Sequence, residues 1–295
     1  MMLQDLDQLI RVDSNCPHVL PLVGTCESPD MLFVVFDHHP ATLKDVLLES
    51  RALERVGKPK GLSACTLSQQ TLLHVCAGVA KGMDHLASSK VCLLYGFLFV
   101  YCHHILACRL RRRFSNISFL SQIIHKQLSA FSVVMAEGLV PKVSNFGISK
   151  FNRPNETMDY TRWTAHEALS NNVYLPKSDV WSMGVLLWEV AALGGTPYAA
   201  VRARQELVKR ITRGLLPNQP RGTSDQLYQL MLQCWQLDVD ERPSFDEIVS
   251  VLSDFVESGQ VRFHARLLLC SLLSLKILHY KEEWHFLPLV FYPGL

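Results

Sequence analysis

The sequence has little net charge and none of the common cysteine motifs. A formal charge of +2 over 295 residues gives no support to the binding of nucleic acid or other polyanions. The nine cysteines include no C-x-x-C pair and are too dispersed for a disulfide scaffold, so we expect reduced thiols. The histidine pairs at 38–39 and 103–104 have no further ligands at metal spacing, so they predict no metal site.

Targeting patterns are also missing. The first residues, MMLQDLDQLIRV, form an amphipathic pattern and lack the basic region, apolar run and cleavage site of a signal peptide. The apolar run from Val91 to Cys102 is well short of the ~20 residues that a membrane-spanning helix needs, because His103 and His104 interrupt it. With 48% hydrophobic and 19% charged residues, the chain is typical of a globular protein without a clear transmembrane span.

Apolar periodicity predicts several helices. Ser68 is a good N-cap, and apolar residues then recur at helical spacing. These are Leu72, Leu73, Cys76, Val79, Ala80, Met83 and Leu86. The run SDVWSMGVLLWEVAALGG at 178–195 is apolar nearly all round, which predicts a buried helix. Further helices are expected within 37–51, around 207–211, over 227–235, and after a capping box formed by Ser244 and Glu247. Strands are expected at 19–26 and 31–36.

Two short loops, separated by a hydrophobic β-hairpin pattern, carry the most informative motifs. HKQLSAFS at 125–132 resembles the protein-kinase catalytic loop H-R-D-x-x-x-x-N, and SNFG at 144–147 resembles the metal-holding D-F-G. The sequence RWTAHE at 162–167 resembles the K-W-x-A-P-E end of a tyrosine-kinase activation segment, and GGTPY at 194–198 is a trait of the same family. Because these motifs appear in order at workable spacings, the sequence is identified as a relative of the receptor-type tyrosine kinases.

The resemblance implies a protein-kinase-like α+β fold with a helical C-lobe. Residues 1–37 would form a truncated N-lobe with helix C and strands four and five, and residues 38–92 and 125–257 would form the C-lobe. The family's glycine-rich loop and its V-A-I-K strand, whose lysine grips the phosphates, have no counterpart in this sequence.

Two segments, 93–124 and 258–295, lie outside the resemblance. The first can be interpreted as a membrane span, which fails on length, as a basic patch at 109–113, or as translated non-coding sequence. We prefer the last interpretation, because removing the segment restores the family register. The second segment is a hydrophobic tail that fits either a membrane-surface or partner helix, or a second stretch of non-coding sequence.

The resemblance places the catalytic base and two metal ligands at Gln127, Ser132 and Asn145, where the family has Asp, Asn and Asp. An amide is not basic near neutral pH, and magnesium usually takes one or two carboxylates. We therefore predict a pseudokinase with a degenerate ATP site. The other implied site residues are His125 and Lys126 in the catalytic loop, Val35, Phe36 and His38 at the hinge, and Phe146 and Gly147 beside the metal position.

Other family positions are retained, and the resemblance gives them structural roles. Asp179 matches the aspartate that hydrogen-bonds the catalytic-loop backbone near His125. Glu167 and Arg242 match the ion pair that ties the activation segment to the loop before the last family helix. Tyr160 lies where an activation-segment tyrosine could be phosphorylated.

The sequence therefore predicts an inactive tyrosine-kinase-like domain that binds or scaffolds signalling proteins or another kinase, without nucleic acid and without a cofactor. The alternatives are an active or weakly active tyrosine kinase that uses Mg-ATP, and a fragment that does not fold stably because its apolar sheet edges are exposed. The resemblance implies a cytoplasmic domain that reaches the plasma membrane through a longer receptor product.

Overall fold

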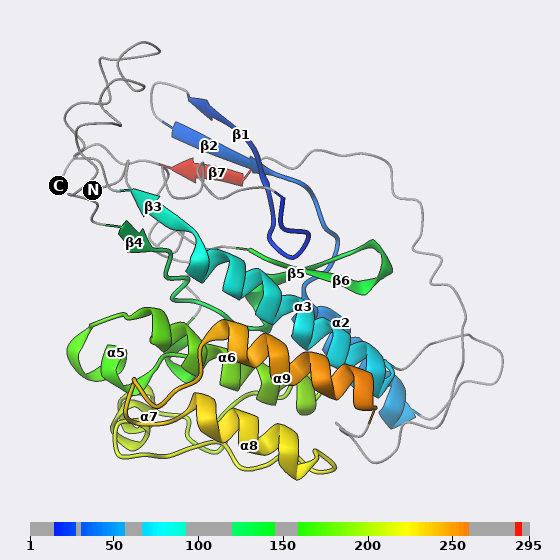
Figure 1. Ribbon diagram of the computed structural model, residues 1–295, viewed down its shortest axis with the longest axis vertical. Helices are drawn as coiled ribbons and strands as arrows, with labels where there is room; N and C mark the ends of the chain where they lie inside the picture. Colours follow the sequence, from blue (N-terminus) through cyan, green and yellow to red (C-terminus); the bar gives the residue numbers. More distant parts are fainter. Residues whose placement is uncertain are drawn as a thin grey trace.

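The computed structural model describes residues 15–27, 31–56, 67–92, 120–144, 159–259 and 287–290. Figure 1 shows a small sheet at one end of the molecule and a mostly helical body at the other. This is the α+β arrangement that the sequence predicts. The expected helix at the N-terminus lies outside the described residues.

The sheet has three antiparallel strands in the order β1, β2, β7. These strands are β1 (Leu22–Glu27), β2 (Met31–Phe36) and β7 (Leu287–Val290). β2 has the predicted bounds, whereas β1 begins three residues later than the expected position 19. The reason is that Val19 and Leu20 are buried beside Val143. Val19 forms an isolated parallel bridge with Val143, and Leu20 N donates to Val143 O at 2.9 Å.

Two helices follow the sheet, α2 (Leu43–Val56) and α3 (Gln69–Ser88). The predicted N-cap of α3 is confirmed, since the Ser68 hydroxyl accepts the Thr71 N–H at 3.0 Å. Its predicted apolar stripe is buried, with exposures of 0% or 1% throughout. This face packs against α6 and α9 and makes α3 a core helix of the body.

Residues 93–119 lie outside the described residues. The residues immediately before and after them lie side by side. β3 (Lys90–Cys92) pairs antiparallel with β4 (Leu120–Gln122). Buried Ile123 then leads into the loop at 125–132. The two ends of the segment 93–119 are therefore joined by a strand pair immediately before the loop at 125–132.

A short hairpin follows the loop. The 3₁₀ turn η1 (Ala130–Ser132) leads into β5 (Val133–Ala136), and η2 (Glu137–Leu139) connects it to β6 (Val140–Val143). Gly138 has a φ of 72° at the tip of the turn, a conformation that glycine adopts without a steric penalty. The predicted hairpin between the two motif loops is thus confirmed.

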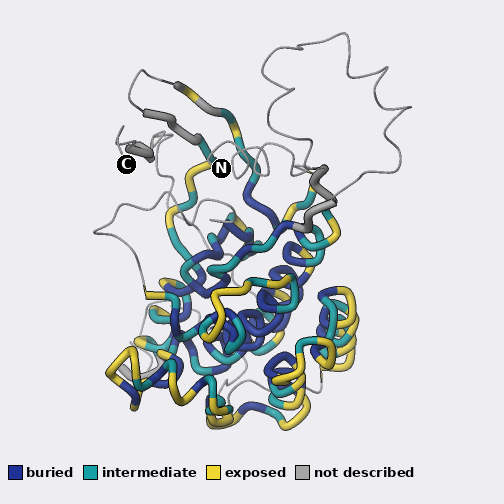
Figure 2. The backbone as a smooth tube through the Cα atoms, turned by 90° about the vertical axis from the view of Figure 1, so that its left-hand side faces the viewer, coloured by how far each residue is buried: buried dark blue, intermediate teal, exposed yellow. Residues whose placement is uncertain are grey.

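The remainder of the body is helical. After η3 (Tyr160–Arg162) come α5 (His166–Asn171), α6 (Pro176–Ala191), α7 (Arg204–Ile211), α8 (Asp225–Cys234) and α9 (Phe245–Ser258). α6 is buried on nearly every side, as its sequence predicts, and Figure 2 shows the buried residues gathered along the central helices. The predicted capping box of α9 is also confirmed, because Glu247 Oε2 accepts the Ser244 N–H at 2.7 Å. Within the described ranges, no helix is both long and apolar enough to cross a membrane.

Candidate functional site

One carboxylate of α6 holds the backbone of the loop at 125–132. Asp179, in the first turn of α6, accepts the His125 N–H at 2.6 Å and the Lys126 N–H at 2.8 Å, with one oxygen for each donor. Burial raises the pKa of Asp179 to about 7, and the two amide donors, which favour the carboxylate, oppose this shift. The loop is thus positioned by a side chain that the sequence singled out for this role.

The ring of His125 has one protonation state that fits its surroundings. It is buried, its Nε2 lies 2.8 Å from Ser144 O, and its Nδ1 accepts the Gln127 N–H at 3.2 Å. Since Nδ1 accepts, Nε2 must carry the proton and donate to the carbonyl, so the imidazole is neutral. Burial lowers the pKa of His125 to about 4, in agreement with this assignment.

Ser132, at a predicted metal position, is fully buried and engaged within its own loop. Its hydroxyl accepts the Ser129 N–H at 2.9 Å and donates to Ser129 O at 3.0 Å. Its carbonyl accepts the N–H of Ser144 at 2.8 Å and the hydroxyl of Ser144 at 3.0 Å. The hydroxyl therefore serves the loop, and its one proton is already committed.

Gln127, at the predicted base position, is half-buried. Its Oε1 is a buried acceptor without a hydrogen-bond partner among the described residues. An amide oxygen in this state can accept a hydrogen bond from a hydroxyl or an N–H, but it cannot take up a proton near neutral pH. Gln127 and Ser132 together offer no carboxylate, so the described part of the site does not fit a magnesium ion.

The remaining predicted nucleotide positions are only partly described. Asn145, Phe146 and Gly147 lie outside the described residues. Val35 and Phe36 are half-buried at the end of β2, and His38 is exposed. The chain that follows them reaches the hairpin, because Met135 N donates to Ala41 O at 3.0 Å. Within the described ranges, no three His, Cys, Asp or Glu side chains gather as a metal site would require.

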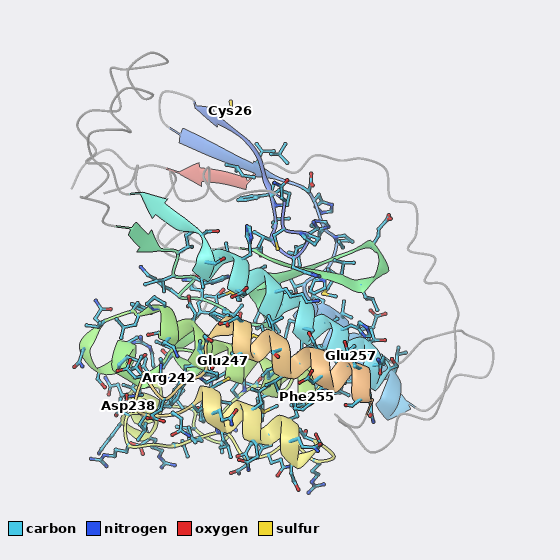
Figure 3. All side chains as sticks on the ribbon, viewed as in Figure 1. Cys26, Asp238, Arg242, Glu247, Phe255 and Glu257 are labelled. Carbon is cyan, nitrogen blue, oxygen red and sulfur yellow. The ribbon has the colours of Figure 1, made fainter. Side chains whose placement is uncertain are left out.

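Glu167 and Arg242 meet as the sequence predicts. The guanidinium donates to both carboxylate oxygens at 2.9 and 2.8 Å, and Ser178 Oγ donates to the same carboxylate at 2.6 Å. Burial would raise the pKa of Glu167, but the hydrogen bonds from Arg242 and Ser178 outweigh it and hold the pKa at about 2. Arg242 lies in the loop between α8 and α9 (Figure 3), so the pair joins this loop to α5.

Tyr160, the predicted phosphorylation site, is half-buried in η3. Its ring packs edge-on against Trp163 with centroids 6.0 Å apart, and burial raises the pKa of its hydroxyl. Its carbonyl accepts the Trp163 N–H at 2.9 Å and the Thr164 hydroxyl at 2.9 Å. Tyr160 is therefore packed and hydrogen-bonded against Trp163 and Thr164, the residues that follow η3.

Glu189 is a buried carboxylate that the sequence analysis did not single out. It is fully buried in α6, and its carboxylate accepts from Lys44 Nζ at 2.9 Å, Ala130 N at 3.0 Å and Trp163 Nε1 at 2.7 Å. The Lys44 ammonium also lies 5.0 Å from the centroid of the Phe131 ring. The signal in the sequence was a glutamate inside the apolar run MGVLLWEVA at 183–191. A carboxylate buried in such a run requires hydrogen-bonding or charged partners.

Comparison with known proteins agrees with this geometry. The family model described as "Protein tyrosine and serine/threonine kinase" matches residues 116–252. The Angiopoietin-1 receptor of Danio rerio is 34% identical over 260 residues, which are 86% of this chain and 20% of the receptor. The chain carries a protein-kinase-like domain whose relatives include receptor tyrosine kinases. The match to the family model begins inside the segment 93–124 and includes the loop at 125–132.

Two further relatives show the breadth of the family. The Drosophila melanogaster protein named "Putative inactive tyrosine-protein kinase Wsck" is 32% identical over 249 residues, which are 83% of this chain and 26% of that protein. The human Vascular endothelial growth factor receptor 1 is 36% identical over 153 residues, or 49% of this chain and 11% of the receptor. The tyrosine-kinase-like domain thus spans about a quarter or less of the length of these relatives.

Proposed function

We propose that this tyrosine-kinase-like domain is a pseudokinase that binds other signalling proteins without transferring phosphate. The observation that carries the proposal is the state of the loop at 125–132. Its backbone is held by Asp179, while the two described positions at which the family has a base and a metal ligand contain Gln127 and Ser132. The frame of a kinase site is thus present without the groups that perform its chemistry.

Each replacement removes a separate contribution to phosphoryl transfer. Gln127 cannot serve as a general base, and the hydroxyl of Ser132 is bonded to Ser129. In the sequence, Asn145 stands where the family has the aspartate that holds magnesium. Such catalytic contributions each change rates by orders of magnitude, so their joint loss is not offset by the binding that remains.

The retained contacts support a binding role. Glu167 with Arg242, and Glu189 with Lys44, fix the segment around Trp163 against the helical body. A rigid surface lowers the entropy cost of recognising a partner. The partners that we propose are signalling proteins or a second, active kinase at the cytoplasmic side of the plasma membrane, because the relatives include receptors.

The decisive experiment measures nucleotide binding and phosphoryl transfer on the full chain. We expect no incorporation of phosphate into a tyrosine-containing peptide polymer, and no rise in Tm when Mg-ATP is added. The matched variant carries Gln127→Asp, Ser132→Asn and Asn145→Asp, which restore the family residues. It is expected to gain a magnesium-dependent rise in Tm, because it restores two carboxylates, but no phosphate transfer, because the family's glycine-rich loop and V-A-I-K lysine have no counterpart in this sequence. Phosphate transfer or a Mg-ATP shift in the wild type would contradict the proposal and favour an active kinase.

A further inference from the structure

A surface cavity of about 540 Å³ lies between α3, the end of α9 and the η2 turn. This volume is within the range of small-molecule sites, which is roughly 300–1,000 Å³. No residue of the loop at 125–132 lines the cavity, so it is separate from the kinase-like site. Part of its lining is apolar, with Ala77, Leu139 and Pro141, and part of it is basic.

Three basic side chains form a row along one wall of the cavity. His74, Gly78 and Lys81 lie on one face of α3, because residues three and four apart share a face of a helix. Gly78 leaves room for the His18 ring, since a Cβ at this position would lie 3.0 Å from two atoms of that ring. His18 therefore packs onto α3 between His74 and Lys81, and all three basic groups line the cavity.

The hydrogen bonds of the two histidines leave the same ring nitrogen for a ligand. His18 Nδ1 lies 3.1 Å from Pro141 O, and His74 Nδ1 lies 2.7 Å from Gln70 O. A carbonyl oxygen only accepts, so each Nδ1 carries a proton, and each Nε2 carries one only when the ring is charged. Within the described ranges neither Nε2 has a hydrogen-bond partner, and the Lys81 ammonium forms no hydrogen bond or ion pair.

The surroundings of the His18 ring disfavour its charged form. Burial lowers the pKa of His18, the hydrogen bond to Pro141 opposes this shift, and the positive charges of Lys81 and Lys142 lower the pKa further. The ring is therefore neutral near pH 7 unless a negative charge lies beside it. A ligand that brings such a charge would meet a basic wall without a carboxylate of its own.

Glu257 is the only acid among the described residues that line the cavity, and it lies at the other end. It is in the last turn of α9 (Figure 3), next to Val256, whose carbonyl accepts Gln70 Nε2 at 3.0 Å. Glu257 is thus near the start of α3, whereas Lys81 is about three turns, or ~16 Å, further along this helix. The cavity is basic at one end and acidic at the other.

We propose that this cavity binds a small organic anion, with its carboxylate- or phosphate-type group between the His18 ring and the Lys81 ammonium. The apolar body of the ligand rests on the lining near η2. Protonated His18 then donates from both ring nitrogens, to Pro141 O and to the anion, so the charged ring has both donors satisfied. Glu257 repels a second anionic group at the far end, so the ligand carries a single one.

The test is a titration of the full chain with benzenesulfonate, followed by NMR of the histidine ring protons. The probe has a fixed negative charge, and benzenesulfonamide is a neutral match of similar size. Benzenesulfonate should shift the ring signals of His18 and His74, which are assigned with His18→Gln and His74→Gln, whereas benzenesulfonamide should leave them unchanged. Equal shifts with both compounds would overturn the proposal, because the cavity would then select an apolar ring and not an anion.

Two lysine variants separate a binding site from a general positive field. Both Lys81 and Lys142 lower the pKa of His18, but of the two only Lys81 lines the cavity. At 0.15 M salt, Lys81→Gln should weaken the binding of benzenesulfonate about fivefold, the upper end for an exposed ion pair. The matched control Lys142→Gln should weaken it by less than about twofold, because this charge lies outside the site. An equal loss in both variants would indicate an adventitious anion only and overturn the proposal.

The pH dependence of binding checks the role of His18. An anion beside the ring raises its pKa, so anion binding and protonation favour one another. The affinity should rise by at most about tenfold per unit as the pH falls from 8 to 6, and the rise should be smaller in His18→Gln, where His74 still titrates. The charged groups on the parts of α3, η2, β6 and α9 around this ring are Lys81, Glu137, Lys142, Asp254 and Glu257. An affinity that does not change with pH would overturn the placement of the anion beside His18.

Discussion

Lys126 has a left-handed backbone with a φ of 68°, which is unusual for a residue with a side chain. This conformation costs about 1–2 kcal/mol in an L-residue. The bonds from the N–H groups of His125 and Lys126 to Asp179 offset that cost, since each charge-assisted bond contributes about 1.5–3 kcal/mol. The Asp179 carboxylate thus holds Lys126 in a left-handed backbone conformation that this residue would otherwise disfavour.

The buried neutral ring of His125 predicts a pH dependence of stability. The pKa of this ring falls from 6.5 in the unfolded chain to about 4 in the folded protein. Between these values the unfolded chain binds a proton that the folded chain excludes. The contribution of His125 is therefore complete above pH 6.5 and declines by about 3 kcal/mol as the pH falls to 4.

The measurement is urea unfolding of wild type and His125→Gln from pH 7 to pH 4. Glutamine can donate to Ser144 O but does not titrate. Asp179 acts in the opposite direction in this range, because burial raises its pKa, so the informative quantity is the difference between the two proteins. We expect the advantage of wild type over the variant to shrink with acidification. A difference that is constant with pH would contradict the assignment of a neutral, buried ring.

At the scale of elements, two glycines of α3 decide how closely the segment at 16–20 approaches the helix. Gly78 and Gly82 are one turn apart on the same face. A Cβ at position 82 would lie 2.4 Å from His18 O, and one at position 78 would lie 2.6 Å from Pro141 Cγ. The His18 carbonyl accepts the Val143 N–H at 2.8 Å, so this close approach also sets the position of β6.

The expected result for Gly82→Ala is destabilisation, opposite to the helix propensity of the two residues. Alanine should gain ~1 kcal/mol in a helix interior, but moving the His18 backbone should cost about 1–3 kcal/mol and disturb its bond to Val143. Chemical denaturation should give a lower unfolding free energy for this variant. Gly24→Ala is the control, because its Cβ meets no atom within 4 Å and should change little. A stabilised Gly82→Ala protein would show that the segment is not tightly docked.

At the scale of the whole molecule, the features that the sequence predicted correctly are those that depend on residue spacing within one element. The stripe of α3, the all-round burial of α6 and the capping box of α9 each follow from spacing within one helix. β7 could not be predicted in this way, since its pairing with β2 joins opposite ends of the chain and its Leu-rich surroundings have no period. The partners of Glu189 were missed for the same reason, because Lys44 and Trp163 come from elements distant in sequence.

The same distinction between sequence patterns and three-dimensional packing applies to the candidate site. Motif spacing was sufficient to predict the contact of Asp179 with His125 and the pairing of Glu167 with Arg242, because both resemble a family pattern. The engagement of Ser132 with Ser129 was not foreseen in detail, since it depends on the fold of the loop itself. The sequence motifs thus identify the residues of the site, whereas the hydrogen-bond partner of a residue such as Ser132 depends on three-dimensional packing.

Glu189 joins four parts of the molecule, and this predicts strong coupling with Lys44. Both side chains are nearly or fully buried, so Lys44→Met would leave the carboxylate without its cation and should cost about 3–5 kcal/mol. Adding Glu189→Gln removes the unpaired charge while keeping an acceptor for Ala130 or Trp163. The double variant should therefore be more stable than Lys44→Met alone. Equilibrium unfolding of the four proteins in this cycle gives the coupling energy, and additive single effects would show that the pair does not hold these parts together.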